Sequence, residues 1–216
     1  MLVIKFKGAV LQNQEVLSDI KSRIKSQNSS CIVVVSALKG IMPRLRQLYS
    51  LSLRKGAGFE EEFAELKRIH EQLACELLCG KKLEEYRAEM QLQLDDLYNI
   101  LHNVAVLRES SHCMKDYILS KGDILASLLF SKLFENASWH DSRNFILTDN
   151  NFGAPEILWE RSCHAVVAEF ENLNGIAVVP GYCGKTSTGY TISLGRVGLS
   201  LTASVLEATF QKVKVA

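Results

Sequence analysis

The sequence predicts an α/β fold: a three-layer α/β/α sandwich on a mainly parallel sheet, with an inserted helical hairpin. Short apolar runs alternate with amphipathic segments near both ends of the chain, the pattern of strand–helix–strand units that build parallel sheets. Between them lie two long segments with apolar residues at three- and four-residue steps, which indicates a pair of long helices. A chain of 216 residues is long enough to bury a substantial core.

The first part of the chain predicts two strand–helix units. Residues 3–6 read as a buried strand that carries Lys5 toward its carboxyl end, and an amphipathic helix follows over 11–24. The β-branched run 31–36 is typical of a strand covered on both faces. A second helix is expected over 42–53.

The middle of the chain predicts the helical insertion, at about 59–108. Its first helix starts near Phe59 with three successive glutamates, where the helix dipole favours anions, and Gly80 stands where a C-cap is expected. The second helix is expected over 83–107, and a third helix runs from about Met114 to Leu133.

The last part of the chain returns to short alternating elements. In order, we expect a strand over 137–140, a polar turn over 148–153, a helix over 157–170, a strand over 176–179, a hairpin loop over 184–189, a helix over 198–210 and the start of a strand at 213–215.

Charge and composition exclude some classes of function. The net charge is +1, with 25 basic and 24 acidic residues, so we expect no nucleic-acid partner. No apolar run approaches the roughly 20 residues that span a bilayer, so we expect no membrane association. The six cysteines contain no Cys-x-x-Cys pair, which favours reduced thiols, a cytoplasmic location and no protein-held metal.

The histidines do not suggest a catalytic triad. His102, His112, His140 and His164 have no serine or cysteine in a recognisable triad context, so structural roles are expected for them.

Seven segments in order carry a resemblance to a known family. They are 5–10, 35–43, 101–107, 120–123, 141–153, 178–184 and 194–200, and they include Val-Ser-Ala-Leu-Lys-Gly, Ser-Lys-Gly-Asp and Leu-Gly-Arg-Val-Gly-Leu-Ser. Together they resemble the N-terminal, amino-acid-binding lobe of aspartokinases, including those fused to homoserine dehydrogenase. The resemblance implies one such domain over 1–216, with the nucleotide-binding lobe outside this chain.

The resemblance also implies a reaction and a site. The ancestral reaction is ATP-dependent phosphorylation of the side-chain carboxylate of L-aspartate, with ATP and Mg²⁺ as cofactors. Lys5 matches the lysine that serves the phosphates. The implied substrate-binding residues are Ser36, Asp123, Arg196 and Ser200, and the implied phosphate-binding loop positions are Gly8, Gly181, Gly184, Gly195 and Gly198.

Several positions depart from the family pattern, and our expectation about activity depends on three of them. Met42 stands where the family has a threonine, Asp123 replaces a glutamate that is one methylene longer, and Ser200 replaces an aspartate. A misplacement of about one ångström can cost about a hundredfold in rate. Because the resemblance also places the nucleotide-binding lobe outside this chain, we expect no kinase turnover from the isolated chain.

An alternative follows from the same departures. A degenerate kinase lobe would act as a carboxylate-binding regulatory module or as a dimerisation module through its helical hairpin. The retained Arg196 and the lost aspartate at Ser200 favour an acidic ligand without an ammonium group. The expected partners are therefore aspartate or another small carboxylate, a second copy of the chain, and a fused or associated homoserine dehydrogenase.

Overall fold

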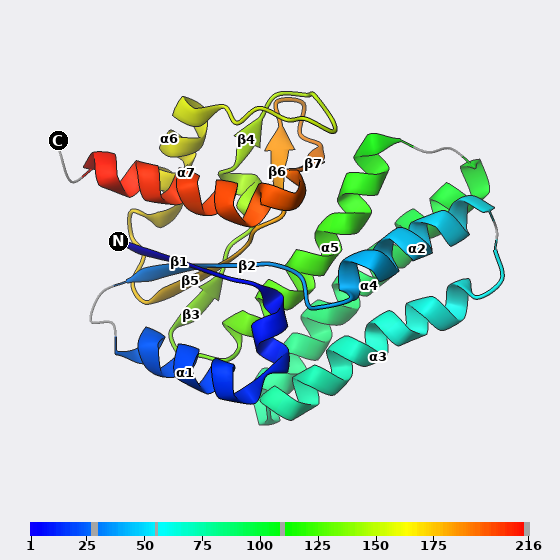
Figure 1. Ribbon diagram of the computed structural model, residues 1–216, viewed down its shortest axis with the longest axis horizontal. Coiled ribbons are helices and arrows are strands. Elements are labelled where there is room, and N and C mark those ends of the chain that lie inside the picture. Colours follow the sequence, from blue (N-terminus) through cyan, green and yellow to red (C-terminus); the bar gives the residue numbers. More distant parts are fainter. Residues whose placement is uncertain (27–29, 55, 109–110, 214–216) are drawn as a thin grey trace.

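The computed structural model describes residues 1–26, 30–54, 56–108 and 111–213. Its central sheet has parallel strands in the order β1-β2-β5-β3, as Figure 1 shows. The strands are β1 Leu2–Phe6, β2 Cys31–Val35, β5 Ile176–Pro180 and β3 Ala137–Trp139. The predicted parallel sheet is therefore confirmed.

Helices cover both faces of this sheet. On one face lie α6 (Trp159–Phe170) and α7 (Gly198–Val213), and on the other lie α1 (Gln14–Lys25) and α5 (His112–Ser131) (Figure 1). Every residue of β2 is buried, because successive side chains enter opposite cores. The β-branched run predicted this double covering, and the three-layer prediction is confirmed.

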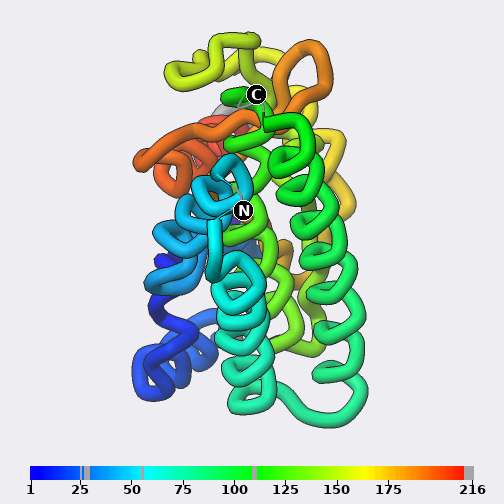
Figure 2. The backbone as a smooth tube through the Cα atoms, turned by 90° about the vertical axis from the view of Figure 1, so that its right-hand side faces the viewer, coloured from blue at the N-terminus to red at the C-terminus, as the bar shows by residue number. Residues whose placement is uncertain are grey.

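The inserted hairpin consists of α3 (Phe59–Leu77) and α4 (Gly80–Leu107), which pack beside α2 (Ile41–Arg54) and α5 (Figure 2). The prediction for Gly80 was wrong, since this residue begins α4 with φ 56° and Leu78 is the C-cap of α3. The chain therefore needs its glycine at the start of the returning helix.

A second small sheet was not predicted. It contains β4 (Leu147–Thr148), β6 (Cys183–Thr186) and β7 (Thr191–Ser193), in the order β4-β6-β7. Gly184, expected in the hairpin loop, is buried within β6, where a Cβ atom would lie 2.5 Å from the Ile146 carbonyl oxygen. The short strands contain too few residues for a periodic signal.

Two further expectations need correction. The strand predicted as buried is β1, at the edge of the sheet, and Lys5 is exposed on it. The strand expected from residue 213 does not start there, because α7 continues through Val213, and residues 214 and 215 lie outside the described residues. Among the described helices, none is long and apolar enough to cross a bilayer.

Candidate active-site cleft

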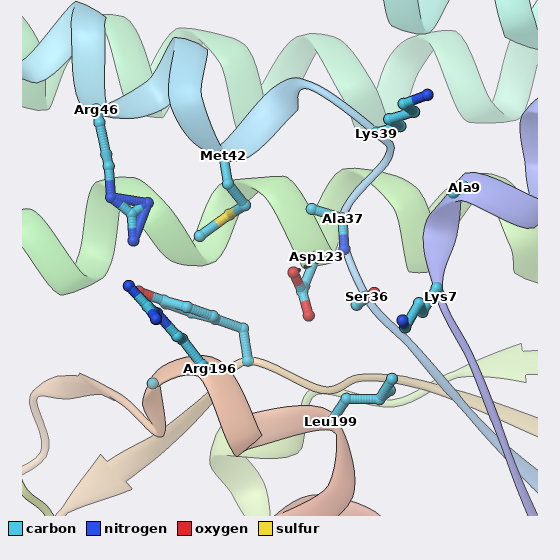
Figure 3. Close-up of a pocket in the computed structure, with 12 residues that line it drawn as sticks. Lys7, Ala9, Ser36, Ala37, Lys39, Met42, Arg46, Asp123, Arg196 and Leu199 are labelled. Carbon is cyan, nitrogen blue, oxygen red and sulfur yellow. Dashed lines mark hydrogen bonds between the residues drawn. The ribbon is translucent and has the colours of Figure 1, made fainter.

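A cleft of about 490 Å³ opens at the carboxyl ends of β1, β2 and β5 (Figure 3). Ligands of open α/β sheets bind at this edge, and the volume suits a small molecule. Residues from both ends of the chain line it: Lys7, Ala9, Ser36, Ala37, Lys39, Met42, Arg46, Asp123, Tyr182, Gly195, Arg196 and Leu199. The crossovers of the parallel sheet bring these segments to one place.

The inner wall of the cleft is formed by Gly8, Ser36, Ala37 and Asp123. Gly8 is buried at the start of η1 (Gly8–Gln12), and its N–H donates a hydrogen bond to Ser36 Oγ over 3.2 Å. A Cβ atom on Gly8 would lie 2.0 Å from the Ser36 carbonyl oxygen. The glycine therefore allows two backbone segments to touch, which is a packing reason for its presence.

Asp123 on α5 completes the inner wall. Its side chain is 2% exposed, and its carboxylate oxygen accepts a hydrogen bond of 2.8 Å from the Ala37 N–H. Burial raises the pKa of Asp123 to about 7, although the backbone N–H groups of Ala37, Gly181 and Tyr182 act to lower it. Near neutral pH, a substantial fraction of Asp123 is therefore uncharged.

The opposite wall begins where α7 meets the turn after β5. A Cβ atom on Gly198 would lie 2.8 Å from the Gly181 carbonyl oxygen, and one on Gly181 would lie 3.0 Å from Leu199 Cα. Thr202 Oγ1 also donates a hydrogen bond of 3.1 Å to the Gly181 carbonyl oxygen. These glycines allow the helix and the turn to approach closely.

Lys5 and Ser200 contact each other although 195 positions separate them in the sequence. Lys5 Nζ donates a hydrogen bond to Ser200 Oγ over 3.3 Å, and both residues are exposed. The serine hydroxyl is therefore oriented toward a lysine of this chain.

Positive charge dominates the lining of the cleft. Lys7, Lys39, Arg46 and Arg196 line it, and Asp123 is the acidic residue among the lining residues. The side chains of these four cationic residues make no hydrogen bond or ion pair with another described residue. Figure 3 shows Arg46 and Arg196, here called the guanidinium pair, directed toward each other, whereas the Lys39 ammonium points away from the cleft.

The structure brings most of the predicted site residues together. Ser36, Asp123, Gly195 and Arg196 line the cleft, and Lys5, Gly8, Gly181, Gly198 and Ser200 lie in the segments that form it. Gly184 does not line the cleft, because it packs inside the small sheet.

Two residues that line the cleft, Arg46 and Tyr182, were not among the predicted site residues. Arg46 follows Met42 by four positions on α2, so the two share a helix face and the signal was present. Tyr182 belongs to the motif segment 178–184; it lines the cleft, and burial raises its pKa.

The expectation for His140 was wrong on one point, because a serine does contact it. His140 Nε2 lies 2.8 Å from Ser138 Oγ, and Nδ1 lies 2.7 Å from Glu169 Oε1. The ring also packs against Phe170 at 5.0 Å between ring centroids. None of these residues lines the cleft, so the chain of hydrogen bonds ties β3 to α6.

The described side chains do not suit a protein-held Mg²⁺ site. Mg²⁺ prefers carboxylate oxygens, and Asp123, the acidic residue of the lining, is buried against the Ala37 N–H. No cluster of three or more histidine, cysteine or acidic side chains is arranged around a common point in the described part of the chain.

Comparison with known proteins decides the family. A model of the amino acid kinase family matches residues 1–211. The chain belongs to the amino acid kinase family. Within it, the chain is 26% identical to aspartokinase 2 of Arabidopsis thaliana, covering 94% of this chain and 39% of the relative. It is also 26% identical to lysine-sensitive aspartokinase 3 of Escherichia coli, covering 100% of this chain and 48% of the relative.

Solved structures agree on the amino acid kinase fold. Aspartokinase III of E. coli in complex with aspartate and ADP superposes with a TM-score of 0.85 at 23% identity, covering 98% of this chain and 47% of that one. The aspartate kinase of Clostridium acetobutylicum superposes with a TM-score of 0.77 at 19% identity, covering 97% of this chain and 45% of that one. The chain is thus an aspartokinase-like domain that spans less than half the length of these relatives, which confirms the predicted resemblance.

Proposed function

We propose that this chain is an aspartokinase-type acid-binding lobe whose cleft binds a small carboxylate. The observation that carries the proposal is a set of cationic side chains that have no partner among the described residues and surround a cleft at the carboxyl ends of the strands. Unpaired charges that border a concave site favour an anionic ligand. The similar E. coli structure, which contains aspartate and ADP, supports a carboxylate as that ligand.

Each side chain would have a distinct part in binding. The planar guanidinium of Arg196 suits a bidentate contact with a carboxylate. Ser36 would add a hydroxyl near the inner wall, where its Oγ already accepts the Gly8 N–H. Lys5 and Lys7, on the β1 side, would face the phosphates of ATP if a nucleotide binds as in the similar structure.

We also propose that this chain alone does not phosphorylate aspartate. Met42 offers no hydrogen-bond donor to a substrate. Asp123 is held against the Ala37 N–H and is partly protonated near neutral pH, so it is a weak partner for a substrate ammonium group. Ser200 cannot supply a negative charge, and its hydroxyl accepts a hydrogen bond from Lys5. Mg²⁺ would have to arrive with the nucleotide phosphates.

The experiment that tests this function has two parts. Hydroxylamine capture of aspartyl phosphate with Mg-ATP and L-aspartate should give no signal above that of Lys5→Ala. A thermal-shift series with small carboxylates should stabilise the wild type and not Arg196→Ala, because only folded protein with an intact site binds. Robust Lys5-dependent capture of aspartyl phosphate would contradict the proposal that the chain is inactive. Equal shifts of the thermal midpoint for the wild type and Arg196→Ala would contradict the proposal that Arg196 forms a carboxylate site.

A homodimer remains a second proposal, supported by exposed apolar residues on α4. Leu92 is 67% exposed, and Val106 and Leu107 are 60% and 57% exposed. Light scattering should report twice the chain mass at micromolar concentration, and a monomer would rule out a dimerisation role. A fused or associated homoserine dehydrogenase and a cytoplasmic location likewise stay predictions; one relative is a bifunctional aspartokinase/homoserine dehydrogenase of A. thaliana.

A further inference from the structure

Two arginines on opposite walls of the cleft point at the same space. Arg46 extends from the second turn of α2, and Arg196 extends from η3 (Gly195–Val197), with their guanidinium groups toward each other (Figure 3). Two like charges repel each other when nothing lies between them. Both side chains are exposed and keep their hydration, so the empty arrangement is tolerated, and an anion between them would turn repulsion into attraction.

The arginines are not committed to structural ion pairs. Neither guanidinium group makes a hydrogen bond or an ion pair with another described residue. Arg44, two positions before Arg46 on the same helix, shows the contrast, because its guanidinium lies 2.7 Å from Glu62 Oε1 on α3. Arg44 therefore fastens two helices together, whereas Arg46 is available to a ligand.

Among the described residues that line the cleft, none offers a comparable contact to an ammonium group of a ligand. The acidic lining residue, Asp123, is 2% exposed and accepts the Ala37 N–H. The Ser200 hydroxyl, on the neighbouring helix, carries no negative charge, and its oxygen already accepts a hydrogen bond from Lys5. Apolar side chains of Met42 and Leu199 line the space between the walls, which suits a short hydrocarbon linker.

We propose that Arg46 is a specificity-determining residue that acts with Arg196, and that the cleft selects a small dianion without an ammonium group. The inference rests on the proposed function, which needs only Arg196 and a single carboxylate. In a dicarboxylate, each carboxylate would meet one guanidinium in a charge-assisted, bidentate contact, and the single phosphate group of a phosphate ester would accept from both guanidinium groups. A dicarboxylate and a phosphate ester share this chemistry, and the experiment separates them.

Isothermal titration of the wild-type chain should compare succinate, L-aspartate, butyrate and inorganic phosphate. Succinate carries two carboxylates, L-aspartate adds an ammonium group, and butyrate has a single carboxylate. We expect succinate or phosphate to bind at least about tenfold more tightly than L-aspartate and butyrate. The ammonium group of L-aspartate is repelled by the two guanidinium groups, and butyrate lacks the charge that would form a second charged hydrogen bond. The tighter of succinate and phosphate identifies which source of the dianion the cleft takes.

Two variants and one control complete the test. Arg46→Ala and Arg196→Ala should each weaken binding of the tighter dianion about tenfold or more, and Arg46→Ala should leave butyrate binding within about threefold. Arg68→Ala is the control, since Arg68 is exposed on α3 and pairs with Glu65 outside the cleft, and it should change nothing. Circular dichroism should show that all three variants keep the fold.

The outcomes separate the two proposals. If Arg196→Ala weakens binding and Arg46→Ala does not, or if L-aspartate binds more tightly than both dianions, the present inference is overturned while the carboxylate site stands. If no anion binds the wild type, or if Arg196→Ala binds all four as well as the wild type, the proposed function fails as well.

Discussion

The inner wall and the guanidinium pair differ in how their polar groups are satisfied. At the inner wall, Gly8, Ser36, Ala37 and Asp123 are joined by hydrogen bonds within the protein and lie at the sheet. Arg46 and Arg196 are exposed, and neither guanidinium group has a hydrogen-bonding partner among the described residues. Residues of the first kind hold the cleft in shape, and residues of the second kind remain available to a ligand. Resemblance to a family motif does not distinguish these two roles, but their contacts do.

The largest expected effect comes from closing the backbone contact at the inner wall. Gly8→Ala places a Cβ atom 2.0 Å from the Ser36 carbonyl oxygen, so η1 and β2 must separate. We expect a loss of more than about 3 kcal/mol in the free energy of unfolding, beyond ordinary overpacking. Urea denaturation measures it.

Gly122→Ala is a matched control for that change. Its Cβ atom would meet Leu45 Cδ1 and Met42 Sδ at 3.2 Å, and these ends of flexible side chains can shift. It would also meet Ala37 Cβ at 3.1 Å, which requires a backbone movement of only a few tenths of an ångström. We expect about 1 kcal/mol or less, since alanine also favours the helix. Equal losses for the two variants would show that the Gly8 contact is not special.

The next effect is the pH dependence that Asp123 gives to stability. Its folded pKa of about 7 lies above its unfolded value near 4. The contribution of Asp123 to the free energy of unfolding is therefore complete below pH 4. It is lost as the pH rises to 7, by at most about 4 kcal/mol. Asp123→Asn keeps an acceptor for the Ala37 N–H and should remove this loss, which urea denaturation from pH 4 to 8 would show as a flatter profile at its alkaline end.

A buried histidine in the inserted hairpin gives a pH dependence of opposite sign. His70 is fully buried on α3, its Nδ1–H donates to the Leu66 carbonyl oxygen over 2.9 Å, and burial lowers its pKa to about 4. Its contribution is complete above pH 6.5 and is lost as the pH falls toward 4, by at most about 3 kcal/mol. His70→Gln should remove that loss.

The opposite pH dependences that Asp123 and His70 give to stability partly cancel in the wild type. Each variant should therefore reveal the pH dependence of the group that remains. Over pH 4–7, Asp123→Asn should become more stable as the pH rises, and His70→Gln should become less stable. Parallel profiles for the two variants would contradict both assignments.

The smallest expected effect lies at the exposed contact between β1 and α7. Ser200→Ala removes the 3.3 Å hydrogen bond from Lys5, and both residues face solvent. We expect the free energy of unfolding to fall by less than about 0.5 kcal/mol, as for other exposed polar substitutions. Differential scanning calorimetry would contradict this result if the midpoint fell by several degrees.

Much of the fold could be predicted because its signals are long and periodic. The β-branched run of β2, and the apolar stripes of α3 and α4, specify buried elements without knowledge of their partners. The small sheet escaped prediction because β4 has two residues and β7 has three. The edge position of β1 also could not be read from residues 2–6, since it depends on which strands pair.

The site was predictable only as far as the motif resemblance extends. The motifs gave Ser36, Asp123 and Arg196, and the structure places all three along one cleft. They could not show that Asp123 is buried against Ala37, or that Arg46 faces Arg196, because both facts depend on the packing of α2 and α5 across the cleft. Gly184 shows the opposite error, since a motif glycine serves packing in the small sheet.

We propose above that Arg196 binds an anion, and we expect that it does not support the fold. Titrating succinate into wild-type and Arg196→Ala protein, with the thermal midpoint of each measured in parallel, tests that claim most directly. We expect the variant to keep the wild-type thermal midpoint and to lose at least about tenfold in affinity for succinate. Unchanged affinity, or a midpoint that falls together with binding, would contradict it.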